Sequence, residues 1–182
     1  FFVFSFEMIS SSNLGIKENT KLKIISDLSQ SIGFNGMVGG QMMDLISEGR
    51  YNQFSPDEKY IMQTQKLKTG ALITFSLKAG GLIGGANKEE LIILEKFGEK
   101  IGLAFQIVDD ILDCTSSENE LGKSVDADIK LGKTTFVTLL GLQESKNKVK
   151  KLIQEAKIEI SKISKNIEKL IMLAEFVEYR KN

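Results

Sequence analysis

Histidine and tryptophan are absent from this sequence, and cysteine and proline occur once each, at Cys114 and Pro56. Without histidine the chain has neither the commonest general base nor the commonest nitrogen ligand, which excludes a Ser-His or Cys-His hydrolase built from this polypeptide alone. A metal ion would have to bind carboxylates, which favours a hard cation such as Mg²⁺. A single cysteine cannot form an internal disulfide, so we expect a cytoplasmic protein.

The chain also has little net charge and no long apolar run. Its 24 basic and 24 acidic residues cancel, so no overall field favours nucleic acid or a membrane surface. No apolar run approaches the ~20 residues of a membrane span. With 182 residues, of which 42% are hydrophobic, the composition predicts a single domain over residues 1–182, with no nucleic-acid partner and no membrane span.

Helical periodicity dominates, and no segment alternates with a period of two, so we predict an all-α bundle of long helices. Ser55 is expected to cap a helix with Pro56 in its first turn, and that helix runs through Lys68 to Gly80-Gly81. Asn87 caps the next helix. Its apolar stripe has spacings of three and four residues: Leu91, Leu94, Gly98, Ile101, Phe105, Val108 and Leu112.

Shorter helices and one loop complete the prediction. Thr20 is expected to cap an early helix, and residues 36–47 form another. Residues 116–133 are polar and contain two glycines, so they are predicted to be a loop. Helices resume at Thr134, and the last one is marked by Leu170, Leu173, Ala174 and Val177.

Three carboxylates share one stripe of the helix that follows Asn87. At about 100° per residue, Gln106, Asp109, Asp110 and Asp113 fall within an arc of roughly 100°. Crowded like charges are unfavourable unless a cation neutralises them, and Mg²⁺ would also bridge to a phosphorylated ligand. The alternative is a solvent-facing acidic edge.

Two further segments contain glycine beside lysine. Gly70 follows Lys68 and Thr69 inside a predicted helix, where glycine costs ~1 kcal/mol relative to alanine. A close approach by a ligand or by another backbone would explain the glycine. The alternative is a helix-packing notch beside a surface lysine. Leu-Gly-Lys occurs twice in the predicted loop, ending at Lys123 and Lys133. These pairs could close over a phosphate, or they are ordinary loop charges.

Taken together and in this order, these segments resemble the trans-isoprenyl diphosphate synthase family. Gly-Gly-Gln-x-x-Asp ends at Asp44, Lys-Thr-Gly-Ala-Leu starts at Lys68, and residues 105–113 resemble the family's second aspartate-rich motif. The resemblance extends from Phe1 to Asn182, as one partial polyprenyl synthetase domain of the isoprenoid-synthase fold. Within the family it is most similar to the bacterial farnesyl or geranylgeranyl type, and the farnesyl diphosphate synthase (geranyltranstransferase) type is favoured.

The resemblance implies a Mg²⁺-dependent prenyltransferase that condenses isopentenyl diphosphate with an allylic diphosphate, with geranyl to farnesyl diphosphate favoured. A homodimer is implied for the full-length enzyme. The implied residues are Asp109, Asp110 and Asp113 for the metal, Lys68, Lys123 and Lys133 for the allylic diphosphate, and Lys68, Thr69 and Gln106 for catalysis.

The sequence departs from the family pattern in two ways. The first aspartate-rich motif and the basic residues that hold isopentenyl diphosphate belong to the family's first third, which is expected upstream of Phe1. Asp126 stands where the family usually has glycine. We therefore expect the chain to be inactive alone and to expose apolar residues such as Leu14, Leu22 and Ile73. The alternatives are a non-catalytic partner subunit of a prenyl synthase, a terpene cyclase, and a purely structural bundle.

Overall fold

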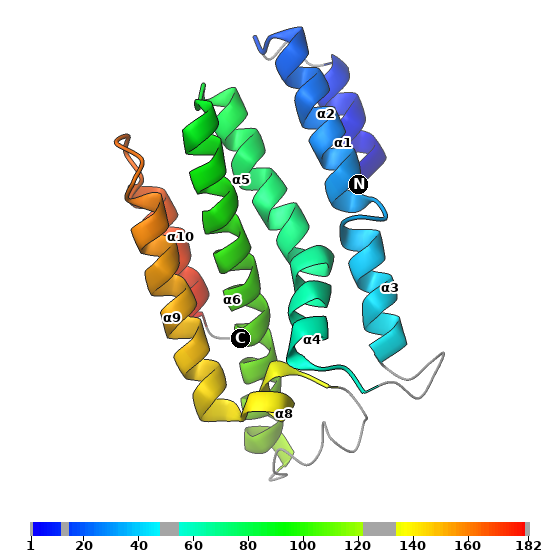
Figure 1. Ribbon diagram of the computed structural model, residues 1–182, viewed down its shortest axis with the longest axis vertical. Helices are drawn as coiled ribbons and strands as arrows, with labels where there is room; N and C mark the ends of the chain where they lie inside the picture. The colour runs from blue at the N-terminus through cyan, green and yellow to red at the C-terminus, as the bar shows by residue number, and fades with distance from the viewer. Residues whose placement is uncertain (1, 12–14, 48–54, 122–133, 181–182) are drawn as a thin grey trace.

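The longest helix, α6 (Lys88–Leu121), runs through the middle of the molecule, with other helices packed along both of its sides (Figure 1). The structure is a computed structural model that describes residues 2–11, 15–47, 55–121 and 134–180, with backbone alone for residues 116–121. No strand occurs in these ranges. The predicted all-α bundle of long helices is therefore confirmed for the described part of the chain.

The remaining helices lie on either side of α6. The α5 helix and α9 make its most extensive contacts, and α10 packs against both α9 and α6. A π-helical turn (Lys66–Gly70) joins α4 to α5, so the two form one continuous helical segment. The other bounds are α1 (Phe2–Ser11), α2 (Glu18–Ile32), α3 (Met37–Ser47), α4 (Glu58–Gln65), α5 (Ala71–Ile83), α8 (Phe136–Leu140), α9 (Leu142–Ile160) and α10 (Glu168–Tyr179).

The sequence predicted some helix ends correctly and missed others. Asn87 caps α6 as predicted: its side chain accepts a hydrogen bond from the Glu90 amide at 2.9 Å, and the Glu90 carboxylate accepts one from the Asn87 amide. Asp57, and not Ser55, caps α4 by accepting from the Tyr60 amide at 2.8 Å. An ionised carboxylate is the stronger acceptor, so it takes the cap position from the serine.

Two other predicted boundaries are wrong. The α2 helix begins at Glu18, so Thr20 lies inside its first turn, where its amide donates to the Lys17 carbonyl. The α6 helix continues to Leu121, so residues 116–121 are helical and not loop. No glycine or proline occurs between Gly102 and Gly122, so no helix-breaking residue ends α6 earlier. Residues 122–133 lie outside the described ranges.

The core forms where α6, α9 and α10 meet. Phe97 and Ala104 on α6, Ile160 and Ala156 on α9, and Ala174 on α10 are fully buried. Burying a side chain as large as that of Phe97 or Ile160 contributes roughly 1.5–3 kcal/mol. Burial of this stripe fixes which side of α6 faces α9, and it leaves the opposite side for contacts with α5.

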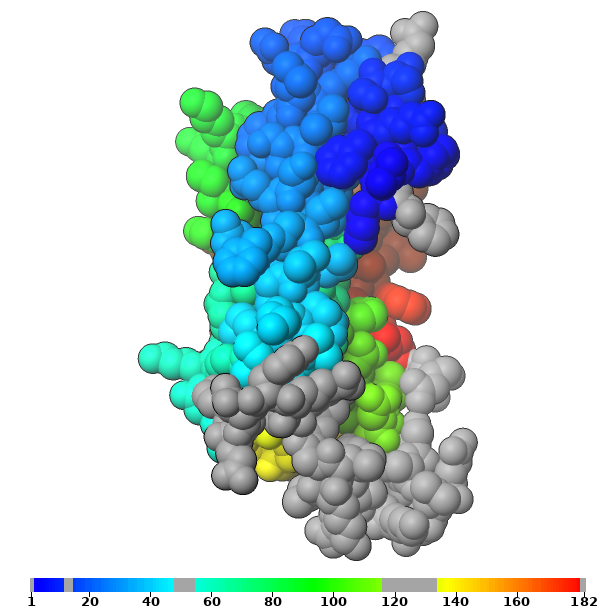
Figure 2. Space-filling model, turned by 90° about the vertical axis from the view of Figure 1, so that its right-hand side faces the viewer, coloured from blue at the N-terminus to red at the C-terminus, as the bar shows by residue number. Residues whose placement is uncertain are grey.

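Large apolar side chains remain exposed at the two edges of the bundle. On α1 and α2 they include Val3, Phe4 and Leu22, and on α10 they include Phe176 and Tyr179. Figure 2 shows the face formed by α1, α2 and α3. The predicted exposure of Leu22 is confirmed, whereas Ile73 is half-buried and Leu14 lies outside the described residues. Within the described residues, no helix is long and apolar enough to cross a membrane.

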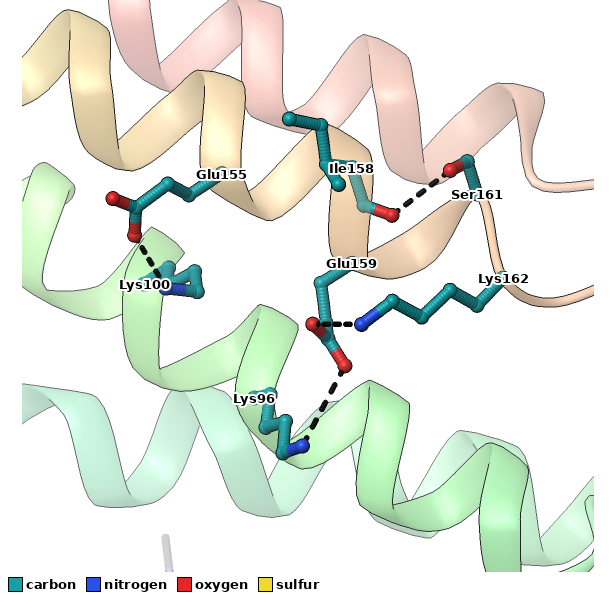
Figure 3. A network of polar contacts seen from close by, with 7 residues as sticks. All are labelled: Lys96, Lys100, Glu155, Ile158, Glu159, Ser161 and Lys162. Carbon is teal, nitrogen blue, oxygen red and sulfur yellow. Dashed lines mark hydrogen bonds and ion pairs between the residues drawn. The ribbon is translucent and has the colours of Figure 1, made fainter.

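Ion pairs join α6 to α9 along the rim of this core (Figure 3). Lys100 contacts Glu155 at 2.6 Å, and Glu159 contacts Lys162 at 2.6 Å and Lys96 at 3.8 Å. A hydrogen bond from Lys100 lowers the pKa of Glu155, and one from Lys162 lowers the pKa of Glu159. Both carboxylates therefore favour the folded state in their ionised form.

We expect these two carboxylates to make unfolding pH-dependent. A pKa that is lower in the folded state gives stability that is present above the ordinary carboxylate pKa and is lost as pH falls through the folded value. The Glu155→Gln/Glu159→Gln double variant should therefore lose less unfolding free energy than the native chain between about pH 5 and pH 3. Urea titrations across this range measure the difference. If the unfolding free energies of the two proteins fell equally with pH, the lowered pKa values assigned to Glu155 and Glu159 would be contradicted.

Candidate functional site

The π-turn that carries Lys68 and Thr69 is held between two glycines from neighbouring helices. A Cβ on Gly40 of α3 would lie 2.2 Å from the backbone nitrogen of Lys68. A Cβ on Gly102 of α6 would lie 2.8 Å from the Cα of Gly70. Only glycine permits backbones to approach this closely. Gly102 thus brings the backbone of α6 against Gly70, but a Cβ on Gly70 itself would meet only the Gln65 carbonyl oxygen, at 3.5 Å, so this contact does not explain the glycine at position 70.

Lys68 projects from this turn into an ion pair that crosses to α3. Its Nζ lies 2.6 Å from Oδ2 of Asp44, which is buried. Lys68 and Thr69 also line an open hollow of about 290 Å³, together with Leu72, Ile73 and Ser76 of α5. A cation and a hydroxyl therefore stand at one end of a hollow that is otherwise mostly apolar.

On α6, Asp109 is the centre of a second polar cluster. The side-chain amide of Gln106 donates to Asp109 Oδ2 at 3.0 Å, and the Arg180 guanidinium pairs with Oδ1. Arg180 also donates to the Phe105 carbonyl at 3.0 Å, and its guanidinium carbon lies 3.9 Å from the centre of the Phe105 ring. Because the Gln106 amide nitrogen faces Asp109, its oxygen faces away from that carboxylate.

The other two aspartates of the stripe lie in different surroundings. Asp110 Oδ2 accepts a hydrogen bond from the Phe136 amide at 3.0 Å, which ties α6 to the start of α8. Asp113 is exposed. Within the described part of the chain, no three or more Cys, Asp or Glu side chains gather as a metal-binding group. The three predicted metal ligands are thus on one helix but are not brought together.

The donor set nevertheless suits Mg²⁺ in its chemistry. Hard carboxylate oxygens are the ligands that this ion prefers. In this structure one of them, Asp109 Oδ1, already binds a cation, the Arg180 guanidinium. Asp109 is also partly open, with 40% of its side chain exposed. Lys123 and Lys133, predicted to bind diphosphate, lie outside the described residues.

Two residues of these clusters were not predicted to have a role. Asp44 is the last residue of the Gly-Gly-Gln-x-x-Asp segment. The sequence showed this segment but gave no indication that Asp44 pairs with Lys68. Arg180 is one of two arginines in the chain, the other being Arg50. Its contact with Asp109 joins residues 71 positions apart, and no local pattern predicts such a contact.

Comparison with known proteins identifies the family. The polyprenyl synthetase family model matches residues 1–171, and this chain belongs to that family. A geranylgeranyl diphosphate synthase of Cyanophora paradoxa is 35% identical over 98% of this chain and 59% of its own length. The chain thus spans about three-fifths or less of the curated relatives it matches.

Solved structures agree on the fold. An FPP/GFPP synthase from Zymomonas mobilis, in its apo form, superposes with a TM-score of 0.82 and 31% identity, over 96% of this chain and 57% of that one. A geranyltransferase from Helicobacter pylori, complexed with magnesium and isoprenyl diphosphate, gives a TM-score of 0.72 and 30% identity. In that comparison, 96% of this chain aligns with 54% of the other.

The glycine contact between the π-turn and α6 generates a stability prediction. Gly102→Ala should cost about 1–3 kcal/mol, because the new Cβ meets backbone at Gly70, which cannot swing aside. Gly80→Ala is the matched control, since a Cβ there meets nothing within 4 Å; it should raise stability by roughly 0.5–1 kcal/mol. Urea unfolding measures both. Equal effects of the two substitutions would contradict the close packing.

Proposed function

We propose that this chain carries the allylic-diphosphate side of a Mg²⁺-dependent prenyl diphosphate synthase, which condenses isopentenyl diphosphate with an allylic diphosphate. The observation that carries the proposal is the position of Lys68 and Thr69 at one end of a mostly apolar hollow, on a turn that packs against α6. A diphosphate needs a cation, and a prenyl chain needs an apolar wall. The hollow offers both.

Lys68 is proposed to bind the allylic diphosphate through its ammonium group, with Lys123 and Lys133 in the same role. The Thr69 hydroxyl and the Gln106 amide oxygen would present their negative ends to the allylic cation. Such preorganised dipoles stabilise charge as it develops in the transition state. Asp109 supports this role for Gln106, because its carboxylate accepts from the amide nitrogen and so sets which end of the amide faces it.

Mg²⁺ is proposed to bind Asp109, Asp110 and Asp113, and when bound it neutralises the diphosphate leaving group. The Helicobacter pylori relative, which is complexed with magnesium and isoprenyl diphosphate, supports the proposal of magnesium as the metal. In the present structure, Asp110 instead accepts from the Phe136 amide, and Arg180 is paired with Asp109. Metal binding therefore implies that these carboxylates exchange at least one of their present partners.

A farnesyl product, formed from geranyl diphosphate, is the product we propose. Relatives of several product lengths match this chain, including geranylgeranyl synthases and the farnesyl diphosphate synthase of Escherichia coli. Product length depends on the depth of the hydrocarbon pocket. Product analysis by chromatography against geranylgeranyl and farnesyl standards decides between the two.

A cytoplasmic homodimer is the proposed form of the full-length enzyme. The apolar residues Val3, Phe4 and Leu22 at the α1–α2 edge are exposed in this chain, and either the expected upstream helices or a second subunit would bury them. Some relatives are chloroplastic, and one is the large subunit of a heterodimeric synthase. Co-purification of a different synthase with this chain would support the partner-subunit alternative.

A chimera tests the proposed activity. The N-terminal helices of the Zymomonas mobilis synthase, joined ahead of this chain, should give Mg²⁺-dependent condensation of geranyl and labelled isopentenyl diphosphates. We expect Lys68→Ala or Asp109→Asn to lower the rate by about 100-fold or more, because each removes charge stabilisation in the transition state.

The chain by itself is the matched control, and we expect it to form no product. The variant Glu175→Gln, which removes an exposed carboxylate of α10 paired with Lys157 of α9, should leave the chimera's rate unchanged. A folded chimera whose rate does not change on Lys68→Ala and Asp109→Asn would contradict the proposed roles of these residues.

A further inference from the structure

The Gly-Gly-Gln-x-x-Asp segment, which the proposed function leaves without a role, lies directly against the turn that carries Lys68. Gly40 provides the contact: a Cβ there would lie 2.2 Å from the Lys68 nitrogen and 2.6 Å from its Cα. Any side chain at position 40 would therefore displace the backbone of the π-turn. The segment fixes where α3 sits relative to Lys68.

One helical turn after Gly40, Asp44 reaches the end of the Lys68 side chain. Four residues separate the two positions, so both lie on the same face of α3. Oδ2 of Asp44 is 2.6 Å from Lys68 Nζ. The carboxylate is the more buried partner, with 11% of its side chain exposed against 30% for Lys68. The buried Asp44 carboxylate thus holds the Lys68 ammonium group, which remains partly accessible to solvent.

The last turns of α3 are themselves anchored to α4. The Tyr60 hydroxyl donates to the Met43 carbonyl at 2.9 Å, one residue before Asp44. Burial and the nearby Asp44 carboxylate both raise the pKa of Tyr60, so the phenol stays protonated and keeps donating. The backbone of α3 around Asp44 is therefore fixed by the Gly40 contact before it and by the Tyr60 hydrogen bond to Met43 beside it.

We propose that Asp44 is the positioning residue of Lys68: it holds the ammonium group at the hollow so that the group meets a diphosphate without first being ordered. The inference depends on the proposed function, in which Lys68 binds diphosphate. An ammonium has three N–H donors, and Asp44 accepts from one of them. A lysine side chain has large rotamer freedom, and restricting it before binding favours the bound state.

A positioning effect of Asp44 and a simple charge effect predict opposite changes in diphosphate affinity when the Asp44 charge is removed. A carboxylate near the site repels an anion, so removing its charge should tighten diphosphate binding if Asp44 acted by charge alone. If Asp44 positions Lys68, its removal should weaken binding, because the lysine must then be ordered when the ligand arrives. The direction of the change therefore separates the two explanations.

The first experiment is titration of the chain with inorganic diphosphate and Mg²⁺ in a calorimeter. Asp44→Asn should raise the Kd by about tenfold, and Asp44→Glu, which keeps the charge, should recover part of the loss. Glu175→Gln is the matched control for lost charge and should change nothing. An unchanged or lower Kd in Asp44→Asn would overturn the inference.

A second measurement does not depend on ligand binding. Limited acetylation, read by mass spectrometry, compares Lys68 with Lys157 in the same molecules. We expect Asp44→Asn to raise labelling at Lys68 several-fold and to leave Lys157 unchanged, because Glu175 still pairs with Lys157. Equal labelling of Lys68 in the native chain and in Asp44→Asn would overturn the inference.

Lys68→Ala separates the inference from the proposed function. If this variant binds diphosphate as the native chain does, or if the native chain binds none, the assignment of Lys68 to diphosphate fails on this chain. The labelling result then decides whether Asp44 holds Lys68. If Lys68→Ala abolishes binding and Asp44→Asn leaves it unchanged, the proposed function stands and the positioning role of Asp44 does not.

Discussion

The arrangement of the site depends on backbone contact at two glycines. Gly102 allows α6 to touch the π-turn at Gly70, and Gly40 allows α3 to touch the same turn at Lys68. Because these contacts are between backbones, the turn cannot shift by changing a side-chain rotamer. Two helices that are distant in sequence thereby fix the position of one short segment, and that segment carries the cation and the hydroxyl proposed to act on the substrate.

The three carboxylates of the acidic stripe on α6 repel one another, so each needs a compensating interaction. Arg180 supplies a cation to Asp109, the Phe136 amide supplies a hydrogen bond to Asp110, and Asp113 is exposed to solvent. Each carboxylate thus has its own means of stabilisation in the ligand-free chain. The sequence suggested that one shared metal ion neutralises the three carboxylates. In the structure, each carboxylate is stabilised separately by a different group or by solvent.

Patterns that are local in sequence were the ones that could be predicted. The periodic stripe of α6, its Asn87 cap and the helix over residues 37–47 follow from spacing and capping chemistry alone. The α4 cap was misplaced because Ser55 and Asp57 are both common cap residues. Which of them caps the helix depends on the strength of the side-chain acceptor, and the Asp57 carboxylate is the stronger. The pairs Asp44–Lys68 and Asp109–Arg180 could not be predicted, because they depend on how separate helices pack. Likewise, the sequence indicated a close approach at Gly70, whereas the glycine that the contact requires is Gly102 on α6.

The π-turn also sets how the chain can change in length. A π-turn holds more residues than an α-helical turn, so removing one residue between Lys66 and Gly70 would leave a regular helix without a break. Because the wide turn takes up the additional residue, the deletion would leave α4 and α5 facing nearly their present directions, with Ile61 and Thr64 of α4 still toward the core. It would instead change the turn itself, whose backbone lies against Gly40 and Gly102 and which carries Lys68. The additional residue in this segment therefore serves the shape of the site more than the packing of the bundle.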